Sequence, residues 1–462
     1  MVLEVQIPGP KGLPMVGNLI AFLRDPLGLT LSSAQIYGDV VRLRIGSKNF
    51  YLISHPAYIQ EILVTKARSF FKLGPSKILK RDRKSRLRVN NTYLQKPALS
   101  NNSRYFLGKD LFKRNHIVTY ESLVGDYINQ VTSRWGNGEG KDIYQEMLCL
   151  TLMIVARTIY GVNLKISEAS EINAAIREIE SWSIKRLISP LCLSENIPIP
   201  SNNRAHRAMT FIDNTFQSAL DEPSMFNSDD VNNVLAMITS FKAKKDGSAS
   251  ITNKQLQDEV MSFFIAGHLS LATTLSWTWY LLSTHPQIQR KLEAELNEIL
   301  GNRHISLADL PRLKYTEMIV WESMRLYPPF WTQARVLMSD YLFGTYRVPS
   351  GSIILISQYV MHRHPKYWDD PERFCPERFD PDLKHERPRF TFFPFGGGHH
   401  QCIGQAFSIM VAKLIIANVT QRYQFELLPQ HPIDVQAYIS LRPKYGIKMS
   451  IAERQMVNGL CV

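Results

Sequence analysis

The feature that most constrains this chain is a glycine-rich turn that carries a cysteine and leads directly into a helical pattern. The turn runs from Phe395 to Gly404 and has Cys402 near its end. The residues that follow place apolar side chains at the spacing of one helical face, namely Phe407, Met410, Val411, Leu414 and Ile415. A thiol here lies at the positive end of a helix dipole, which favours the thiolate, the form that binds metal. Glycines let the backbone pass close to a flat partner, because no Cβ intervenes.

Three simpler interpretations of this turn compete. A phosphate-binding loop would need a Gly-Lys-Ser/Thr ending, which the turn lacks, and Gln401 stands where a third glycine would be. A zinc site could use His399, His400 and Cys402, but the chain offers no CxxC or HxxxH pair as a partner. A buried structural cysteine is the third interpretation, and for an isolated cysteine it is the default.

The whole pattern F-x-x-G-x-x-x-C-x-G closely resembles the haem-ligand signature of the cytochrome P450 family. In that family the cysteine thiolate is the axial ligand of the haem iron. The resemblance implies haem b (iron protoporphyrin IX) as the cofactor and Cys402 as the metal ligand. It also implies that Phe395, Gly396 and Gly404 shape the cofactor-binding loop.

A second signature of the family supports this resemblance. Glu322 and Arg325 lie three residues apart on a helix predicted to start near Leu313, so their side chains share one face. Taken alone, such a pair is usually an ordinary surface ion pair. The segment Asp370–Phe379 matches the family further along the chain, and the resemblance implies that Glu322, Arg325 and Arg378 form a buried, structural charge network.

A third signature lies on a long apolar helix predicted to begin near residue 252 or 253. In the family this helix crosses the distal face of the haem, and the resemblance assigns catalytic positions to Ala266, Gly267 and Ser270. Two departures affect proton delivery. Leu269 occupies the position of the usual acid and cannot relay a proton, and Ser270 replaces the usual threonine but can still donate one hydrogen bond.

The resemblance also implies charge-assisted contacts to the two haem propionates. Arg335 and His400 match family positions for these contacts. The usual Trp-x-x-x-Arg is missing, because Asn101 and Tyr105 stand at its two positions. Arg104 is the nearest cation and becomes a candidate replacement.

Substrate-facing positions follow from the same resemblance. For each of these side chains, packing in the protein core is about as compatible with the sequence as contact with a substrate. The adjacent aromatic residues Phe330 and Trp331 suggest a planar, apolar substrate. The candidate pocket consists of Phe264, Ile265, Leu269, Phe330, Trp331, Thr332, Tyr438 and Ile439.

The implied fold is mainly α with a smaller β portion (α+β), a cytochrome P450 fold in one large domain over residues 1–462. The haem would lie between the long central helix and the cysteine loop. Residues 1–18 are rich in proline and glycine, residues 30–65 and 335–450 are expected to supply strands, and residues 115–335 are expected to be mostly helical. Residues 40–46 and 50–53 alternate around a turn and predict a hairpin.

Composition limits the partners. Lys and Arg number 54 against 41 Asp and Glu, a formal charge of +13. The cations are scattered and no recognition motif accompanies them, so an acidic protein partner fits better than nucleic acid. The five cysteines are far apart, which indicates a reducing cytoplasm. The first residues lack the apolar run of a membrane helix or signal peptide, so we expect a soluble, bacterial-type, monomeric protein with no membrane span.

The predicted function is oxidation of an apolar, aromatic or terpenoid small molecule by a haem-thiolate monooxygenase. A separate ferredoxin or flavodoxin with its reductase would supply electrons, since no flavin domain follows. One alternative is oxidative radical coupling of an aromatic substrate, for which Leu269 would keep the pocket dry. Others are peroxide-driven chemistry, rearrangement without net oxidation, and a non-enzymatic haem sensor.

Overall fold

The computed structural model describes residues 6–72, 114–188, 197–221, 253–383, 387–438, 440–454, 456–457 and 460–461. Arg104 and Ile439 therefore lie outside the described residues. The chain divides into two compact units, each built from separate stretches of sequence. Unit 1 comprises Met1–Ile78, Trp321–Cys402 and Ala437–Leu441, and unit 2 comprises Leu79–Val320, Ile403–Gln436 and Arg442–Val462. That all of it forms one domain stays a prediction.

Unit 1 is built around a five-stranded sheet. Its strand order is β1 (Val40–Ile45), β2 (Lys48–Ile53), β8 (Ile353–Ile356), β5 (Gln333–Leu337) and β3 (Phe70–Lys72). Strands β2 and β8 run parallel, and the other neighbours are antiparallel. The β1–β2 pair confirms the predicted hairpin.

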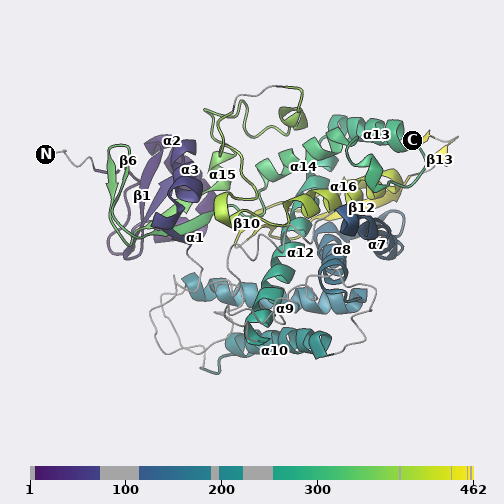
Figure 1. The fold of residues 1–462 in the computed structure, drawn as a ribbon, viewed down its shortest axis with the longest axis horizontal. Helices are drawn as coiled ribbons and strands as arrows, with labels where there is room; N and C mark the ends of the chain where they lie inside the picture. The colour runs from purple at the N-terminus through teal and green to yellow at the C-terminus, as the bar shows by residue number, and fades with distance from the viewer. Residues whose placement is uncertain are drawn as a thin grey trace. The chain divides into compact units, whose positions relative to one another are not determined.

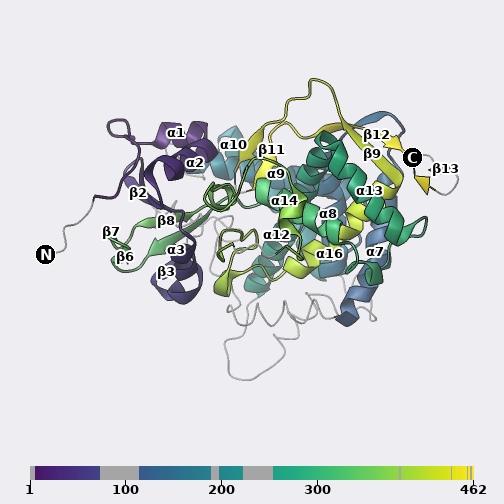
Figure 2. The same cartoon turned by 90° about the horizontal axis from the view of Figure 1, so that it is seen from above.

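Alternation along these strands divides the apolar side chains between the two faces of the sheet. Tyr51 and Ile53 of β2 join one core cluster, whereas Leu52 between them joins the other. The first cluster includes side chains of α3 (Pro56–Gln60) and the π-helical turn η1 (Glu61–Thr65). The second includes α2 (Pro26–Tyr37) and α15 (Gln358–Met361). Figure 2 shows α2 and α3 on opposite sides of β2.

The remaining elements of unit 1 are short. Strands β6 and β7 form a separate hairpin, and the C-terminal part of α14, from Trp321 on, belongs to this unit. The remaining elements are α1 (Leu19–Arg24), η2 (Ala67–Ser69), α14 (Lys314–Leu326), β6 (Tyr341–Phe343), β7 (Tyr346–Val348), η5 (Pro376–Phe379) and η6 (Gly398–His400).

Unit 2 is mostly helical. Its helices are α7 (Arg114–Thr132), α8 (Ile143–Tyr160), α9 (Ile166–Ile188), α10 (Pro200–Asp221), α12 (Asn253–Thr284), α13 (Pro286–Leu300), η4 (Leu307–Asp309) and α16 (Gln405–Arg422). A three-stranded antiparallel sheet joins distant parts of the chain in the order β4 (Glu139–Asp142), β12 (Lys448–Glu453) and β9 (Tyr423–Leu427). Two further strand pairs are β10 (Val435–Ala437) with β11 (Leu441–Pro443), whose residues are divided between the units, and β13 (Met456–Val457) with β14 (Leu460–Cys461).

Helix α12 packs along α8, and α9 lies beside α10, as Figure 1 shows. The Thr151 hydroxyl of α8 donates to the backbone carbonyl of His268 in α12 at 3.1 Å, which links the two helices. The predicted mainly helical chain with a smaller strand portion is confirmed. Across the described residues, none of the helices combines the length and apolarity needed to cross a membrane.

Candidate functional site

The cysteine loop of unit 1 is held by backbone hydrogen bonds. The Cys402 N–H donates to the Phe395 carbonyl at 2.9 Å, and the Gly396 N–H donates to the Phe393 carbonyl at 2.9 Å. Gly396 and Gly398 both have positive φ, at 73° and 65°, a region that side chains other than glycine rarely adopt. Cys402 is exposed. The loop thus presents a thiol and bare backbone on the same short segment.

Close packing is the second reason for glycine in this loop. A Cβ on Gly398 would lie 1.9 Å from the Leu63 carbonyl oxygen, and one on Gly397 would lie 2.5 Å from the Phe390 ring. The loop therefore rests directly on η1 and on Phe390. His400 is exposed, Phe395 and Gly404 are half-buried, and α16 begins at Gln405, with Gly404 as its N-cap residue.

Arg335 is a buried cation beside this loop. Its side chain is 3% exposed, and burial lowers the pKa of its guanidinium to about 10. Nη1 donates to the Ala334 carbonyl at 3.0 Å and Nη2 to Gln333 Oε1 at 3.2 Å. Gln333 in turn borders Gly396, whose added Cβ would lie 3.5 Å from Gln333 Nε2. No ion pair with a carboxylate is found for Arg335 among the described residues.

These observations fit haem as the bound group. The exposed Cys402 thiol can supply, as a thiolate, the sulfur ligand of a haem iron. The uncovered glycine backbone accommodates a flat ring. A propionate would provide the carboxylate that the described residues do not offer to the buried Arg335 guanidinium. His400 is the second candidate for such a contact.

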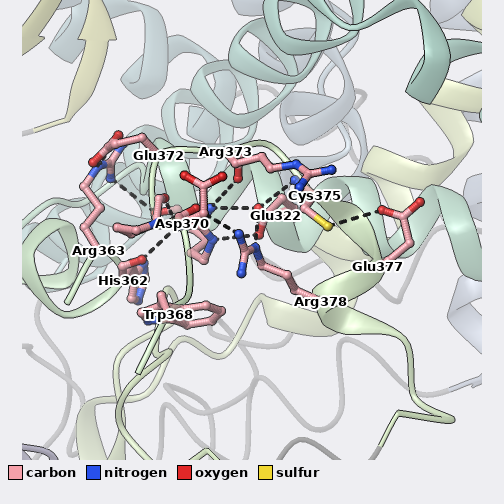
Figure 3. Close-up of polar contacts among 12 residues, drawn as sticks. Glu322, His362, Arg363, Trp368, Asp370, Glu372, Arg373, Cys375, Glu377 and Arg378 are labelled. Atoms are coloured by element: carbon pink, nitrogen blue, oxygen red, sulfur yellow. Dashed lines mark hydrogen bonds and ion pairs between the residues drawn. The ribbon is translucent and has the colours of Figure 1, made fainter. Parts of the chain in front are cut away.

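Glu322, Arg325 and Arg378 come together in unit 1, as predicted for a charge network. Arg325 Nε and Nη2 each donate to one carboxylate oxygen of Glu322 at 2.7 Å, and both side chains are 0% exposed. Arg378 Nε lies 3.5 Å from Glu322 Oε1. The Cys375 N–H also donates to this oxygen at 2.9 Å. Figure 3 shows Arg373, Cys375 and Arg378 around Glu322.

Arg325 also ties three backbone carbonyls to α14. Nη1 donates to the carbonyls of His362 at 2.9 Å and Pro371 at 2.6 Å, and Nη2 donates to that of Arg373 at 3.0 Å. Each of these acceptors follows Arg325 by more than thirty residues. The arginine therefore holds a long irregular segment in place, and the two carboxylate contacts offset the cost of burying its charge.

In unit 2, α12 presents a narrow open face. Ala266 is exposed and Gly267 and Ser270 are half-buried, whereas the candidate pocket residues Phe264, Ile265 and Leu269 are buried. Ala266 and Ser270 are four residues apart and share a face, because an α-helix repeats every 3.6 residues. The Ser270 hydroxyl donates to the Ala266 carbonyl at 2.7 Å. Leu269 lies on the packed side of the helix.

The other pocket candidates lie in unit 1. Trp331 is buried and its indole N–H donates to the Tyr438 carbonyl at 2.8 Å. The Thr332 hydroxyl donates to the Ile356 carbonyl at 3.1 Å. Both side chains thus have structural contacts, and Phe330, Thr332 and Tyr438 are half-buried.

Two buried histidines carry contacts that the sequence did not suggest. His362 accepts a hydrogen bond from the Phe393 N–H, and His268 bonds the Phe264 carbonyl through Nδ1 at 2.8 Å. Each histidine follows an apolar run, which is also the pattern of an ordinary core histidine. The sequence alone therefore held no signal that would single them out.

Comparison with known proteins gives a consistent result. A family model described as Cytochrome P450 matches residues 7–450. Cyclooctatin synthase of Streptomyces melanosporofaciens is 29% identical over 94% of this chain and 92% of its own length. Cyclooctat-9-en-7-ol 5-monooxygenase of the same organism is 30% identical over 91% of this chain and 89% of its own. Pentalenene oxygenase of Streptomyces avermitilis is 28% identical over 96% of this chain and 97% of its own length.

The solved structures agree with the sequence matches. A retinoic acid-bound cyanobacterial CYP120A1 superposes with a TM-score of 0.80 and covers 96% of this chain and 98% of its own, at 22% identity. This likeness supports the fold, and the family match over nearly the whole chain supports haem as the cofactor. The chain belongs to the cytochrome P450 family and is a haem-dependent monooxygenase.

Proposed function

We propose that this enzyme hydroxylates an apolar, terpenoid-like small molecule. The observation that carries the proposal is the open face of α12, where Ala266 and Gly267 leave room and the Ser270 hydroxyl is already bonded to the Ala266 carbonyl. Such a face offers a substrate shape and apolar contact rather than hydrogen bonds. The names of three relatives refer to cyclooctatin, cyclooctat-9-en-7-ol and pentalenene, which supports a substrate of this class.

Haem, when bound, supplies the activation of dioxygen that the protein's own side chains cannot perform. Cys402 would hold the iron through its thiolate, and Arg335 and His400 would bind the propionates. Arg335 has the stronger case, since its buried guanidinium lacks an ion-pair partner in the described part of the chain. These contacts fix the orientation of the group relative to the chain.

Ser270 is the candidate to hold a proton on the open face of α12. Its O–H donates to the Ala266 carbonyl at 2.7 Å, and its oxygen can still accept a hydrogen bond from a water molecule. Leu269 cannot take part, because its side chain is apolar and only 5% exposed. Protons would therefore pass from water to Ser270 without a carboxylate.

Oxidative radical coupling is the second candidate function. It is favoured by the apolar Leu269 at the position that carries an acid in most of the family. A substrate that supplies its own hydrogen atom would need no acidic relay. The two functions predict different products, since hydroxylation adds one oxygen atom and coupling removes hydrogen without adding oxygen.

A substrate screen tests the proposal. Purified holoenzyme is titrated with cyclic terpenes and with polycyclic aromatic phenols, and binding is followed by the shift of the haem absorption spectrum. Bound compounds are then turned over, and the products are analysed by mass spectrometry. Terpenes that bind and gain one oxygen atom support hydroxylation. Aromatic compounds that dimerise or close a ring support coupling and contradict the proposal.

The role of Ser270 can be tested on the same helix. Ser270→Ala should lower the fraction of consumed dioxygen that appears in product, and Ser270→Thr should restore it. Ser276→Ala is the matched control, because the Ser276 hydroxyl makes the same kind of bond, to the Ala272 carbonyl at 2.6 Å, on the fully buried side of α12. If the fraction of consumed dioxygen that appears in product is the same in all three variants, a proton role for Ser270 is excluded.

The enzyme needs redox partners, as its family does. We infer an acidic ferredoxin or flavodoxin with its reductase as the electron donor. The formal charge of +13 supports this inference, because opposite charges steer such encounters. That the protein is cytoplasmic and monomeric stays a prediction.

A further inference from the structure

His362 lies fully buried in unit 1, between the Glu322–Arg325 pair and the start of the cysteine loop. Its backbone carbonyl accepts a hydrogen bond from Arg325 Nη1 at 2.9 Å. Its ring nitrogen Nε2 lies 3.0 Å from the backbone nitrogen of Phe393. His362 thus bonds both the Glu322–Arg325 pair and the start of the cysteine loop. Figure 3 shows His362 at the edge of the charge network.

The contact with Phe393 fixes the protonation state of the ring. A backbone N–H can only donate, so Nε2 accepts and carries no proton. The ring is then neutral, with its proton on Nδ1. Burial and the positive charges of Arg325 and Arg363 hold the pKa of His362 well below its usual range, which agrees with a neutral ring.

Aromatic neighbours fix the orientation of the ring. Its centroid lies 4.8 Å from that of Phe392 in a tilted arrangement and 5.5 Å from that of Phe393 in an edge-on arrangement. Rotation of the imidazole would break both contacts together with the hydrogen bond. Nε2 is therefore held in place before any ligand binds.

Backbone hydrogen bonds continue from Phe393 to the cysteine. The Phe393 carbonyl accepts from the Gly396 N–H at 2.9 Å, and the Phe395 carbonyl accepts from the Cys402 N–H at 2.9 Å. A displacement at Phe393 would therefore pass through the loop to Cys402. His362 contacts this series of backbone hydrogen bonds at the Phe393 N–H.

We propose that His362 is a positioning residue for Cys402. By accepting the Phe393 N–H, the neutral imidazole ties the base of the cysteine loop to the buried Glu322–Arg325 pair. It thereby sets where the thiolate stands for its bond to iron. His362 acts through Phe393 and the loop backbone, and not by contact with the haem.

Two substitutions separate the hydrogen bond from the packing. His362→Phe keeps an aromatic ring against Phe392 but removes the acceptor. His362→Gln offers Oε1 as an acceptor near the position of Nε2. His364→Phe is the matched control, because His364 lies two residues away, is half-buried and makes none of the contacts described for His362.

The measurement is the long-wavelength Soret band of the ferrous carbonyl complex, which reports thiolate ligation, and the rate at which this band is lost. We expect about tenfold faster loss in His362→Phe, the effect of one buried donor left without its acceptor. His362→Gln should recover most of the stability of the band, and His364→Phe should match the wild type. A wild-type rate in His362→Phe would overturn the proposal. A lower melting temperature with an unchanged band would also overturn it, because it would indicate a merely structural role.

A second measurement does not depend on the folding of His362→Phe. Isotope-labelled histidine in the wild-type holoenzyme reports the tautomer of each ring by NMR, and His362→Gln identifies the signal of His362. We expect a neutral ring with the proton on Nδ1. A proton on Nε2 would exclude the hydrogen bond from Phe393 and with it the proposal.

Discussion

At the residue scale, the glycines of the cysteine loop are required for two distinct reasons. Gly398 has a φ of 65° and leaves no space for a Cβ, which would meet the Leu63 carbonyl oxygen at 1.9 Å. Gly351 has a φ of 78°, but a Cβ there would meet nothing within 4 Å. A side chain at Gly351 would therefore meet backbone strain alone, whereas one at Gly398 would meet both strain and steric overlap.

We expect Gly398→Ala to lose haem binding and to lower the melting temperature far more than Gly351→Ala. The second substitution carries only the strain of a left-handed alanine, about 1 kcal/mol. The first must also push the loop away from η1. Haem content and thermal unfolding of the two variants check this prediction. Equal losses would show that the contact with Leu63 does not matter.

His268 illustrates a second residue-scale effect, a titratable group that is buried in its neutral form. Burial lowers its pKa from 6.5 to about 4. The folded ring therefore stays neutral while the ring of the unfolded chain takes up a proton below about pH 6.5. Its contribution to stability is fully present above that pH and is lost as the pH falls toward about 4.

We expect His268→Leu to flatten the acid side of the stability curve. Between about pH 7.5 and about pH 5, its free energy of unfolding should fall by about 2 kcal/mol less than that of the wild type. Denaturant unfolding at the two pH values measures the difference. His304→Leu, at an exposed position, should retain the wild-type dependence. A His268→Leu curve parallel to the wild type would contradict the prediction.

At the element scale, Arg325 fastens α14 to an irregular segment that has little regular structure of its own. Its guanidinium bonds Glu322 within the helix and the carbonyls of His362, Pro371 and Arg373 outside it. A buried carboxylate that loses such a partner has no water to stabilise it, and Arg378 Nε, 3.5 Å from Glu322 Oε1, does not replace two bonds at 2.7 Å.

Arg325→Ala should lower the free energy of unfolding by about 3–5 kcal/mol and reduce haem occupancy. Arg347→Ala is the control, because Arg347 pairs with Asp340 at 2.8 Å but both side chains are about half exposed. Such surface pairs contribute about 0–1 kcal/mol. Soluble yield, haem content and unfolding are compared for the two variants. A fully loaded Arg325→Ala of wild-type stability would show that the buried network is dispensable.

Helix α12 shows how side-chain hydroxyls shape an element. The hydroxyls of Ser270, Thr273, Thr274, Ser276 and Thr278 each donate to the carbonyl four residues earlier. This bonding satisfies polar groups inside a packed helix and often bends it. It explains how a helix with so many hydroxyl residues can lie buried against α8.

At the scale of the whole molecule, the positive charge bears on electron delivery. With an acidic ferredoxin as donor, turnover should fall as salt rises from about 20 mM to about 300 mM, since the screening length shrinks toward about 6 Å. Turnover driven by hydrogen peroxide provides the control, because it needs no protein encounter. Ferredoxin-driven turnover that is indifferent to salt would contradict electrostatic docking.

The sequence by itself determined the family and several local elements, and it predicts Cys402 as the ligand of the haem iron. The β1–β2 hairpin follows from alternation around a turn, and α13 from Pro286 at its start and Gly301 after its end. The pairing of Glu322 with Arg325 follows from their spacing on one helix. These features depend on neighbours within a few residues, so local patterns suffice to predict them.

Only the tertiary structure decided which side chains are buried and which backbone groups they bond. Trp331 is buried with its indole N–H bonded to the Tyr438 carbonyl, and Leu269 lies on the packed side of α12. The remaining acceptors of Arg325 and the contact of His362 with Phe393 involve backbone atoms, which every residue possesses. Backbone groups leave no trace in residue identity, so only the fold brings such partners together.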